Sequence, residues 1–298
     1  MRPIDALRLV TLAAIWGASF VFLRLAAPVI GPWLLAELRV MLAALTLLAV
    51  VRASRFDLQW RSNWRGYLLI GLVNAAVPFA LFSYAAVHIP ASYSAVVNAT
   101  SPLFGALFAA LFLAESLTLR RAAGMAAGIA GVALLVGFGP LAVSPQIVLA
   151  AVAALVGSGC YGLASVLARK SMASITPLAL AAGSQICAAI LLSPAYAAWP
   201  GAAAFTLVSV ASVIALAVVS SALALLMYFR LIADIGPARA LTVTFLIPLF
   251  GILWGAIFLG EQLTPVMLGG AALVILATWM VVGQRSRSYQ SAPAETTR

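Results

Sequence analysis

The residue that is most costly to place in this sequence is an arginine inside a long apolar run. Arg39 follows Pro32 by seven residues, so a helix that begins at this proline carries it roughly 10 Å into the run. A guanidinium there is strongly unfavourable unless it faces protein or water. Its paired N–H donors suit an anion such as a carboxylate. The alternative hypothesis is a structural lock, in which Arg39 pairs with Glu37 or with helix-end carbonyls.

Two prolines mark a second group of polar residues. Pro102 and Pro248 lie within apolar runs, and each frees the backbone carbonyl four residues earlier, on Asn98 and Thr244. We therefore predict two kinks with polar surroundings. These polar groups either line a solute path or satisfy one another.

Other aromatic and polar side chains inside apolar runs are candidates for an amphipathic cavity. They are Trp16, Tyr84, Tyr161 and Ser220. For any one of them, ordinary packing is the competing interpretation.

The acidic residues are informative because of where they are missing. None of the seven is predicted near the centre of an apolar run, and the one histidine, His88, is expected in a loop. Proton-driven carriers commonly use an intramembrane carboxylate or histidine, so facilitated diffusion is the default expectation. Glu115 and Glu261 fall at the ends of apolar runs, where each either begins a turn or acts as a gate contact.

The composition assigns the class of protein. Of the 298 residues, 65% are hydrophobic and 8% are charged, whereas a soluble domain is about half apolar and a quarter charged. The class is therefore an all-α integral membrane protein. The charge of +10 is spread between apolar runs and forms no basic face, so we expect no nucleic-acid partner. With no nucleophile-and-base pair and no metal-ligand spacing, we also expect no enzyme activity, metal or cofactor.

Apolar runs of about 20 residues, the length that crosses a bilayer, predict ten transmembrane helices. They lie near 6–25, 32–51, 66–87, 92–113, 120–138, 146–168, 176–197, 206–230, 237–259 and 265–283. Lys and Arg precede span 1 and follow spans 2, 4, 6 and 8, and the loops after spans 3, 5, 7 and 9 contain neither. Both termini are therefore predicted to face the cytoplasm.

An internal repeat predicts the architecture. Residues 102–118 recur as residues 248–264 with 11 identities in 17 positions, at an offset of 261 − 115 = 146. Five spans per half is an odd number, so the second half is inverted relative to the first. We predict repeats at 1–140 and 141–283 around a central cavity, followed by a disordered cytoplasmic tail at 284–298. Inverted repeats are typical of secondary transporters.

The segment from Trp16 to Phe20, Arg39, and the Pro-Leu-Phe-Gly to Glu-x-Leu-Thr block in both halves resemble the EamA family of the drug/metabolite transporter superfamily. Within it, the overall pattern is most similar to YddG-type bacterial amino acid exporters. The resemblance implies ten helices in two inverted halves and no cofactor. It places Trp16, Asn98 and Arg39 in or beside the cavity, with Pro102 and Pro248 on the helices that line it. The position that matches Arg39 is Ser184 or Gln185, so the cavity is expected to be asymmetric.

These expectations combine into one functional hypothesis. The chain carries amino acids, aromatic and other neutral ones, by alternating access across a bacterial inner membrane, as a monomer in the lipid bilayer. The alternative is efflux of another small metabolite or a drug-like compound, with or without proton coupling.

Overall fold

The structure is a computed structural model that describes residues 2–113, 115–138, 143–171, 175–198, 204–235, 240 and 242–282. Every regular element in these ranges is a helix. Nine of the helical stretches are long and apolar enough to cross a membrane, and a tenth, Val243–Leu259, is apolar but shorter. The predicted all-α membrane fold is confirmed. The predicted tail at 284–298 and the predicted boundary between the halves at 140/141 lie outside the described residues.

Among the described residues, seven spans are single helices and three are divided. The single helices that reach full length are α1 (Pro3–Ile30), α2 (Pro32–Ala53), α7 (Leu119–Phe138), α8 (Pro145–Ser171), α9 (Pro177–Ala198) and α14 (Pro265–Val282). Span 3 consists of α3 (Trp60–Gly71), the π-helical segment η1 (Leu72–Ala76) and α4 (Val77–His88). Span 4 consists of α5 (Ala91–Asn98) and α6 (Ser101–Leu113). Span 8 consists of α10 (Leu207–Ile214), the π-helical segment η2 (Ala215–Leu223) and α11 (Ala224–Ile235), and α13 (Val243–Leu259) is span 9.

Proline and glycine set many of the helix boundaries. Helices α1, α2, α8, α9 and α14 each begin with a proline, because the first helical position needs no N–H donor and favours the fixed φ of the ring. Gly260 ends α13 in the left-handed region, with φ of 65°, where glycine carries no steric penalty. These signals explain why the predicted spans agree with the observed ones to within a few residues at most ends.

Two close helix crossings follow the internal repeat. Helix α1 packs on α13, and α8 packs on α6. A Cβ atom added to Gly17 would lie 2.6 Å from the Phe250 Cβ atom, and one added to Gly162 would lie 2.6 Å from the Phe104 Cβ atom. The two phenylalanines are 146 residues apart, so each half presents the same helix surface to the first helix of the other half. Small residues at such crossings let transmembrane helices approach closely.

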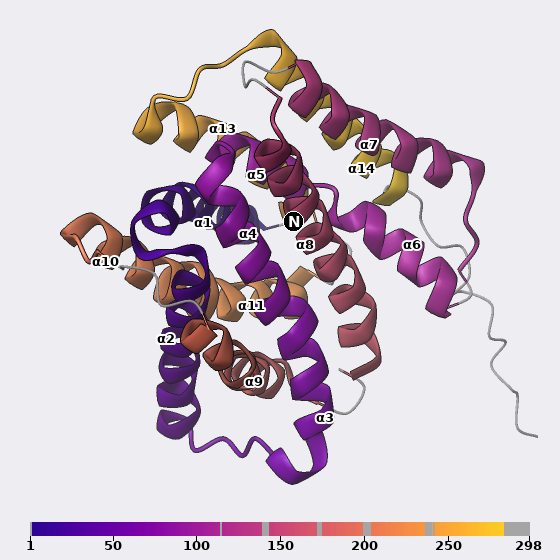
Figure 1. The fold of residues 1–298 in the computed structure, drawn as a ribbon. Helices are drawn as coiled ribbons and strands as arrows, with labels where there is room; N and C mark the ends of the chain where they lie inside the picture. Colours follow the sequence, from indigo (N-terminus) through magenta and orange to yellow (C-terminus); the bar gives the residue numbers. More distant parts are fainter. Residues whose placement is uncertain are drawn as a thin grey trace, which may run out of the picture.

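Two further pairs join each helix to its own counterpart in the repeat. Helix α2 packs on α9, and α7 packs on α14. Figure 1 shows α7 and α14 side by side along one edge of the bundle, with α2 and α9 together at the opposite side. The buried core that joins the halves draws residues from α1, α2, α4, α5, α7, α8, α10, η2, α13 and α14. The bundle is therefore held together mainly by contacts between the two halves.

Pro102 and Pro248 do not produce the two matched kinks that the sequence predicts. Pro102 is the second residue of α6, where its missing N–H costs no helical hydrogen bond. Span 4 is broken between Asn98 and Ser101, whereas Pro248 lies inside the continuous helix α13. The Asn98 carbonyl accepts a hydrogen bond from the Ser101 hydroxyl at 2.6 Å. In the first half, then, local hydroxyls satisfy the carbonyls that the break leaves free.

Candidate functional site

Arg39 is buried in the bundle, and two other spans hold its guanidinium. Its side chain is on α2 and the residue is 6% exposed. The Nε atom donates a hydrogen bond to the Ser221 hydroxyl at 3.0 Å, and the guanidinium carbon lies 3.7 Å from the centre of the Phe79 ring. The Glu37 Oε2 atom is buried and has no hydrogen-bond partner in the described part of the chain. No ion pair joins Glu37 to Arg39 among the described residues, and the other form of the structural lock, pairing with helix-end carbonyls, stays a prediction.

The Ser221 side chain belongs to η2, where the backbone is wound more widely than in an α-helix. The Ser221 hydroxyl donates to the Leu216 carbonyl, five residues earlier, at 2.9 Å. The neighbouring Ser220 carbonyl accepts a hydrogen bond from the Trp16 indole at 3.1 Å. π-Helical segments free backbone groups in this way and occur frequently at functional sites. Span 1 and span 2 thus both bond to the same widened turn of span 8.

Aromatic rings surround this turn. The Trp16 ring lies 5.4 Å from the Tyr228 ring, and the Tyr161 ring stacks on Phe82 at 5.9 Å. Tyr161 packs against the apolar cluster that contains Phe79, the ring that covers the Arg39 guanidinium. The Ser220 hydroxyl is buried and has no partner among the described residues. The site therefore combines one cation, an unused hydroxyl and aromatic surface.

Four of the six predicted substrate residues meet here, and two do not. Arg39, Trp16, Ser220 and Tyr161 come together through the contacts above. Tyr84 instead packs on His88, with ring centres 5.0 Å apart, near the end of α4. Asn98 is the last residue of α5 and is partly exposed. Neither side chain makes a hydrogen bond or ring contact with Arg39 or Trp16 within the described ranges.

Glu261 caps a helix of the other half. Its carboxylate accepts hydrogen bonds from the backbone N–H groups of Ala91 at 2.7 Å and Ser92 at 3.0 Å. These are the first two residues of α5, where a negative charge also meets the positive end of the helix dipole. Glu261 therefore ties the end of α13 to the start of α5. A gate role for this contact stays a prediction.

Two other predicted gate residues are Glu115 and Thr244. Glu115 pairs with Arg121 at 3.5 Å, and Arg121 also donates to the Ser116 carbonyl at 3.1 Å. Thr244 is partly buried on α13, one turn before Pro248. Their part in gating also stays a prediction.

Sequence reasoning missed Phe79 as a partner of Arg39 and the bond that Arg39 makes with Ser221. Phe79 is 40 residues from Arg39 and Ser221 is 182 residues away, and neither carries a motif. The structure shows that η1 and η2 occupy matching positions at the offset of 146. Arg24 was also not recognised as a helix cap, although it donates to the Ala86 and Val87 carbonyls at 2.8 and 2.7 Å.

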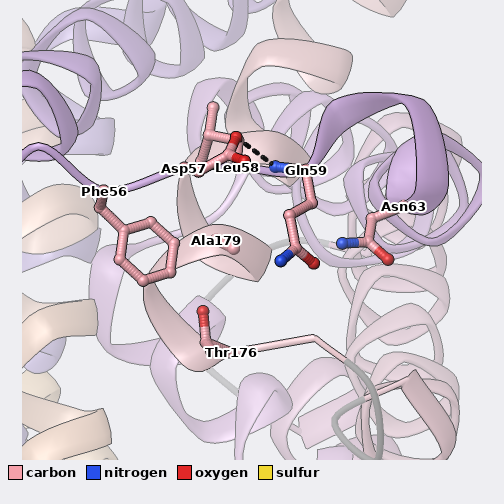
Figure 2. Close-up of a pocket in the computed structure, with 7 residues that line it drawn as sticks. All are labelled: Phe56, Asp57, Leu58, Gln59, Asn63, Thr176 and Ala179. Atoms are coloured by element: carbon pink, nitrogen blue, oxygen red, sulfur yellow. Dashed lines mark hydrogen bonds between the residues drawn. The ribbon is translucent and has the colours of Figure 1, made fainter.

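A small pocket lies away from this site, between the loop after α2 and the start of α9. Figure 2 shows its lining residues, Phe56, Asp57, Leu58, Gln59, Asn63, Thr176 and Ala179. The Asp57 carboxylate accepts a hydrogen bond from the Gln59 backbone N–H at 2.9 Å, drawn as the dashed line in Figure 2. The pocket holds about 230 Å³ of empty space, including its open mouth. None of the predicted substrate residues lines it.

Comparisons with known proteins agree on the class of the chain. The sequence model of the EamA-like transporter family matches residues 5–137 and 148–283. The chain is 26% identical to the uncharacterized transporter YvbV of Bacillus subtilis (strain 168), over 96% of this chain and 94% of that protein. It is 26% identical to a probable terminal-alkyne amino-acid exporter of Streptantibioticus cattleyicolor, over 72% of this chain and 71% of the exporter. A crystal structure of a protein that is 19% identical superposes with a TM-score of 0.65, covering 94% of this chain and 96% of that one.

Proposed function

The chain belongs to the EamA-like transporter family, and we propose that this member carries amino acids, aromatic and other neutral ones, across a bacterial inner membrane by alternating access. Membrane transport is the general activity of the family. The substrate class and the roles of individual residues are the proposal.

The observation that carries the proposal is the unfilled hydrogen-bonding capacity of Arg39. A guanidinium has five N–H donors, and only the Nε donor has a partner among the residues that the structure describes. A buried charge without a counter-charge is costly, and no carboxylate forms an ion pair with Arg39 in the same ranges. A substrate carboxylate would supply this charge and match the planar fork of the two Nη groups.

The surroundings of Arg39 favour a substrate with a partly apolar body. Phe79 covers one face of the guanidinium and Tyr161 packs against the same apolar cluster. Trp16 bonds to the neighbouring turn of η2 and contacts Tyr228. Aromatic faces of this kind accept apolar and aromatic groups. The unpartnered Ser220 hydroxyl supplies one more polar contact. A neutral amino acid, with its carboxylate at Arg39 and its side chain against the rings, uses all three features. The similarity to the terminal-alkyne amino-acid exporter supports the same class.

Alternating access is supported by the contacts between the halves. Glu261 in the second half bonds to α5 in the first half, and a contact of this kind has to break and reform if the halves rock about the site. We propose further that the protein acts as a monomer with both termini in the cytoplasm. Four exposed arginines at this end of spans 2 and 3 agree with this orientation: Arg52 in the last turn of α2, Arg55 in the loop, and Arg61 and Arg65 at the start of α3.

The test is uptake of labelled L-phenylalanine into proteoliposomes, with empty liposomes as the baseline. We expect saturable uptake that does not depend on an imposed pH gradient. Arg39→Gln is expected to raise KM at least about tenfold, the cost of one charge-assisted hydrogen bond. Arg52→Gln, an exposed arginine on the same helix, is the matched control and should transport normally.

Two outcomes would contradict parts of the proposal. Absence of uptake of any neutral amino acid by folded protein would refute the substrate class and favour another small metabolite or a drug-like compound. Accumulation that follows the pH gradient would refute facilitated diffusion and direct attention to Glu37 and His88 as proton sites.

A further inference from the structure

The orientation of the Arg39 guanidinium is fixed by one hydroxyl group. The Ser221 oxygen accepts from Nε at 3.0 Å, while the Phe79 ring covers one face of the guanidinium at 3.7 Å. Nε lies at the base of the planar group, so a bond there fixes the direction of the two Nη atoms beyond it. The ring defines the plane, and the hydroxyl defines the rotation within that plane.

The Ser221 hydroxyl is itself held in one orientation. Its hydrogen is donated to the Leu216 carbonyl at 2.9 Å, which leaves an oxygen lone pair for Arg39. Donating to a carbonyl also polarises the hydroxyl and strengthens it as an acceptor. The widened turn of η2 thus presents an acceptor whose direction the backbone determines.

The repeat shows that this hydroxyl is not needed to form a π-helical segment. The position that matches Ser221 at the offset of 146 is Ala75, which lies within η1. The first half therefore forms its π-helical segment with an alanine at this position. Because the backbone geometry does not require the serine, its contact with Arg39 is what distinguishes the second segment from the first.

The partners of this contact are also specific to one half. At the same offset, Phe79 corresponds to Leu225 and Arg39 corresponds to Gln185. The first set combines a cation, an aromatic face and an acceptor. The matching set, Gln185, Leu225 and Ala75, has no cation and no aromatic ring, and its one side-chain acceptor is the amide oxygen of Gln185.

We infer that Ser221 is a positioning residue that sets the preference of this transporter for solutes with a free carboxylate. The inference rests on the proposed function, because it assumes that Arg39 binds a substrate carboxylate. Ser221 itself does not touch the substrate. It holds the Nη pair of Arg39 in the direction that a carboxylate requires, so its loss weakens binding of carboxylates and leaves binding of neutral analogues unchanged.

The experiment compares two competitors of labelled L-phenylalanine uptake in proteoliposomes, unlabelled L-phenylalanine and L-phenylalaninamide, which lacks the carboxylate. Ser221→Ala is expected to raise the inhibition constant of L-phenylalanine about five- to tenfold, which corresponds to about 1–1.4 kcal/mol, the net contribution of an ordinary hydrogen bond. The constant for the amide should not change, nor should the maximal rate. Ser221→Thr retains a hydroxyl and should restore the wild-type preference.

Two controls separate positioning from stability. Ser212→Ala removes another buried hydroxyl of span 8, which donates to the Val208 carbonyl at 2.8 Å and has no bond to an arginine. This variant should keep the wild-type preference. In an Arg39→Gln background, Ser221→Ala should have no further effect on the preference, because the group that it orients is gone.

The outcomes distinguish this inference from the proposed function. Equal weakening of both competitors in Ser221→Ala, or an unchanged ratio between them, would overturn the positioning role while wild-type amino acid transport still stood. An additional loss of preference in the Arg39→Gln background would overturn it as well. If the wild-type protein transports no amino acid, the proposed function fails first.

Discussion

The contact that Glu261 makes across the two halves yields the most direct prediction about stability. Its carboxylate accepts the backbone N–H groups of Ala91 and Ser92 at 2.7 and 3.0 Å. Replacing Glu261 with alanine leaves two donors at the start of α5 without an acceptor, since the first N–H groups of a helix have no partner within it. It also removes the negative charge that faces the positive end of the helix dipole.

The expected loss can be worked out from these two bonds. Hydrogen bonds to a charged group contribute about 1.5–3 kcal/mol each, and Glu261 is partly exposed, so the lower end applies. Glu261→Ala should therefore reduce the free energy of unfolding by about 3 kcal/mol. Glu261→Gln keeps an oxygen acceptor but loses the charge, and should cost about half as much.

The assay is thermal unfolding of the purified protein in detergent, followed by tryptophan fluorescence. The melting temperature should fall in the order wild type, Glu261→Gln, Glu261→Ala. Glu37→Gln is the matched control, because it makes the same chemical change at another glutamate. The Glu37 Oε2 atom is buried and accepts no hydrogen bond in the described ranges, so the change removes none at this atom. A Glu261→Ala variant that melts with the wild type, or a Glu37→Gln variant that loses as much as Glu261→Gln, would refute the capping argument.

Three further predictions concern helix packing, a helix end and an ion pair. Gly17→Ala should lower the free energy of unfolding by about 1–3 kcal/mol, because its Cβ atom would lie 2.6 Å from the Phe250 Cβ atom. The control is Gly137→Ala, where an added Cβ atom has no neighbour within 4 Å. This variant should be neutral or stabilising in the same melting assay. Arg24→Gln should cost about 2 kcal/mol, since Arg24 donates to the Ala86 and Val87 carbonyls at the end of α4; an unchanged melting temperature would show that water replaces the arginine there. Asp234→Asn should lower the free energy of unfolding by less than about 1 kcal/mol, because the partners of Asp234, Arg8 and Arg230, are 33% and 70% exposed. The difference in melting temperature from the wild type should shrink at high salt. A difference that salt does not change would contradict a screened ion pair.

Most of the fold could be predicted from the sequence because membrane helices leave strong local signals. Apolar runs of bilayer length and prolines at helix starts can be recognised from residues that are neighbours in the sequence. The repeat of residues 102–118 can be recognised from one constant offset. The π-helical segments η1 and η2 were not predicted, because a single widened turn changes neither the composition nor the length of a span. The break before Pro102 was predicted as a kink, since sequence alone does not distinguish a proline inside a helix from one that begins a helix.

The candidate site was predictable only where the cost of burial identifies a residue. Arg39 was singled out because a cation in an apolar run needs a partner. The identity of that partner was not predictable, since Ser221 reaches Arg39 through the packing of span 2 on span 8. Glu261 was placed correctly at a helix end, but the helix that it caps is 170 residues away in the sequence.

The two halves share a backbone plan but not the chemistry of their matching positions, and this difference bears on what the site accepts. Both halves contain a π-helical segment in their third span, packed against the second span of the other half. At the constant offset of 146, Gln185 matches Arg39. Gln185 is 1% exposed, and its Oε1 atom has no partner among the described residues. A second arginine there would place two cations in one bundle and require a doubly charged anion or two anions to balance them. A neutral amide carries no such requirement, so the site as a whole holds one fixed positive charge. Under the proposed function, the asymmetry therefore favours a solute with a single carboxylate over a multiply charged anion.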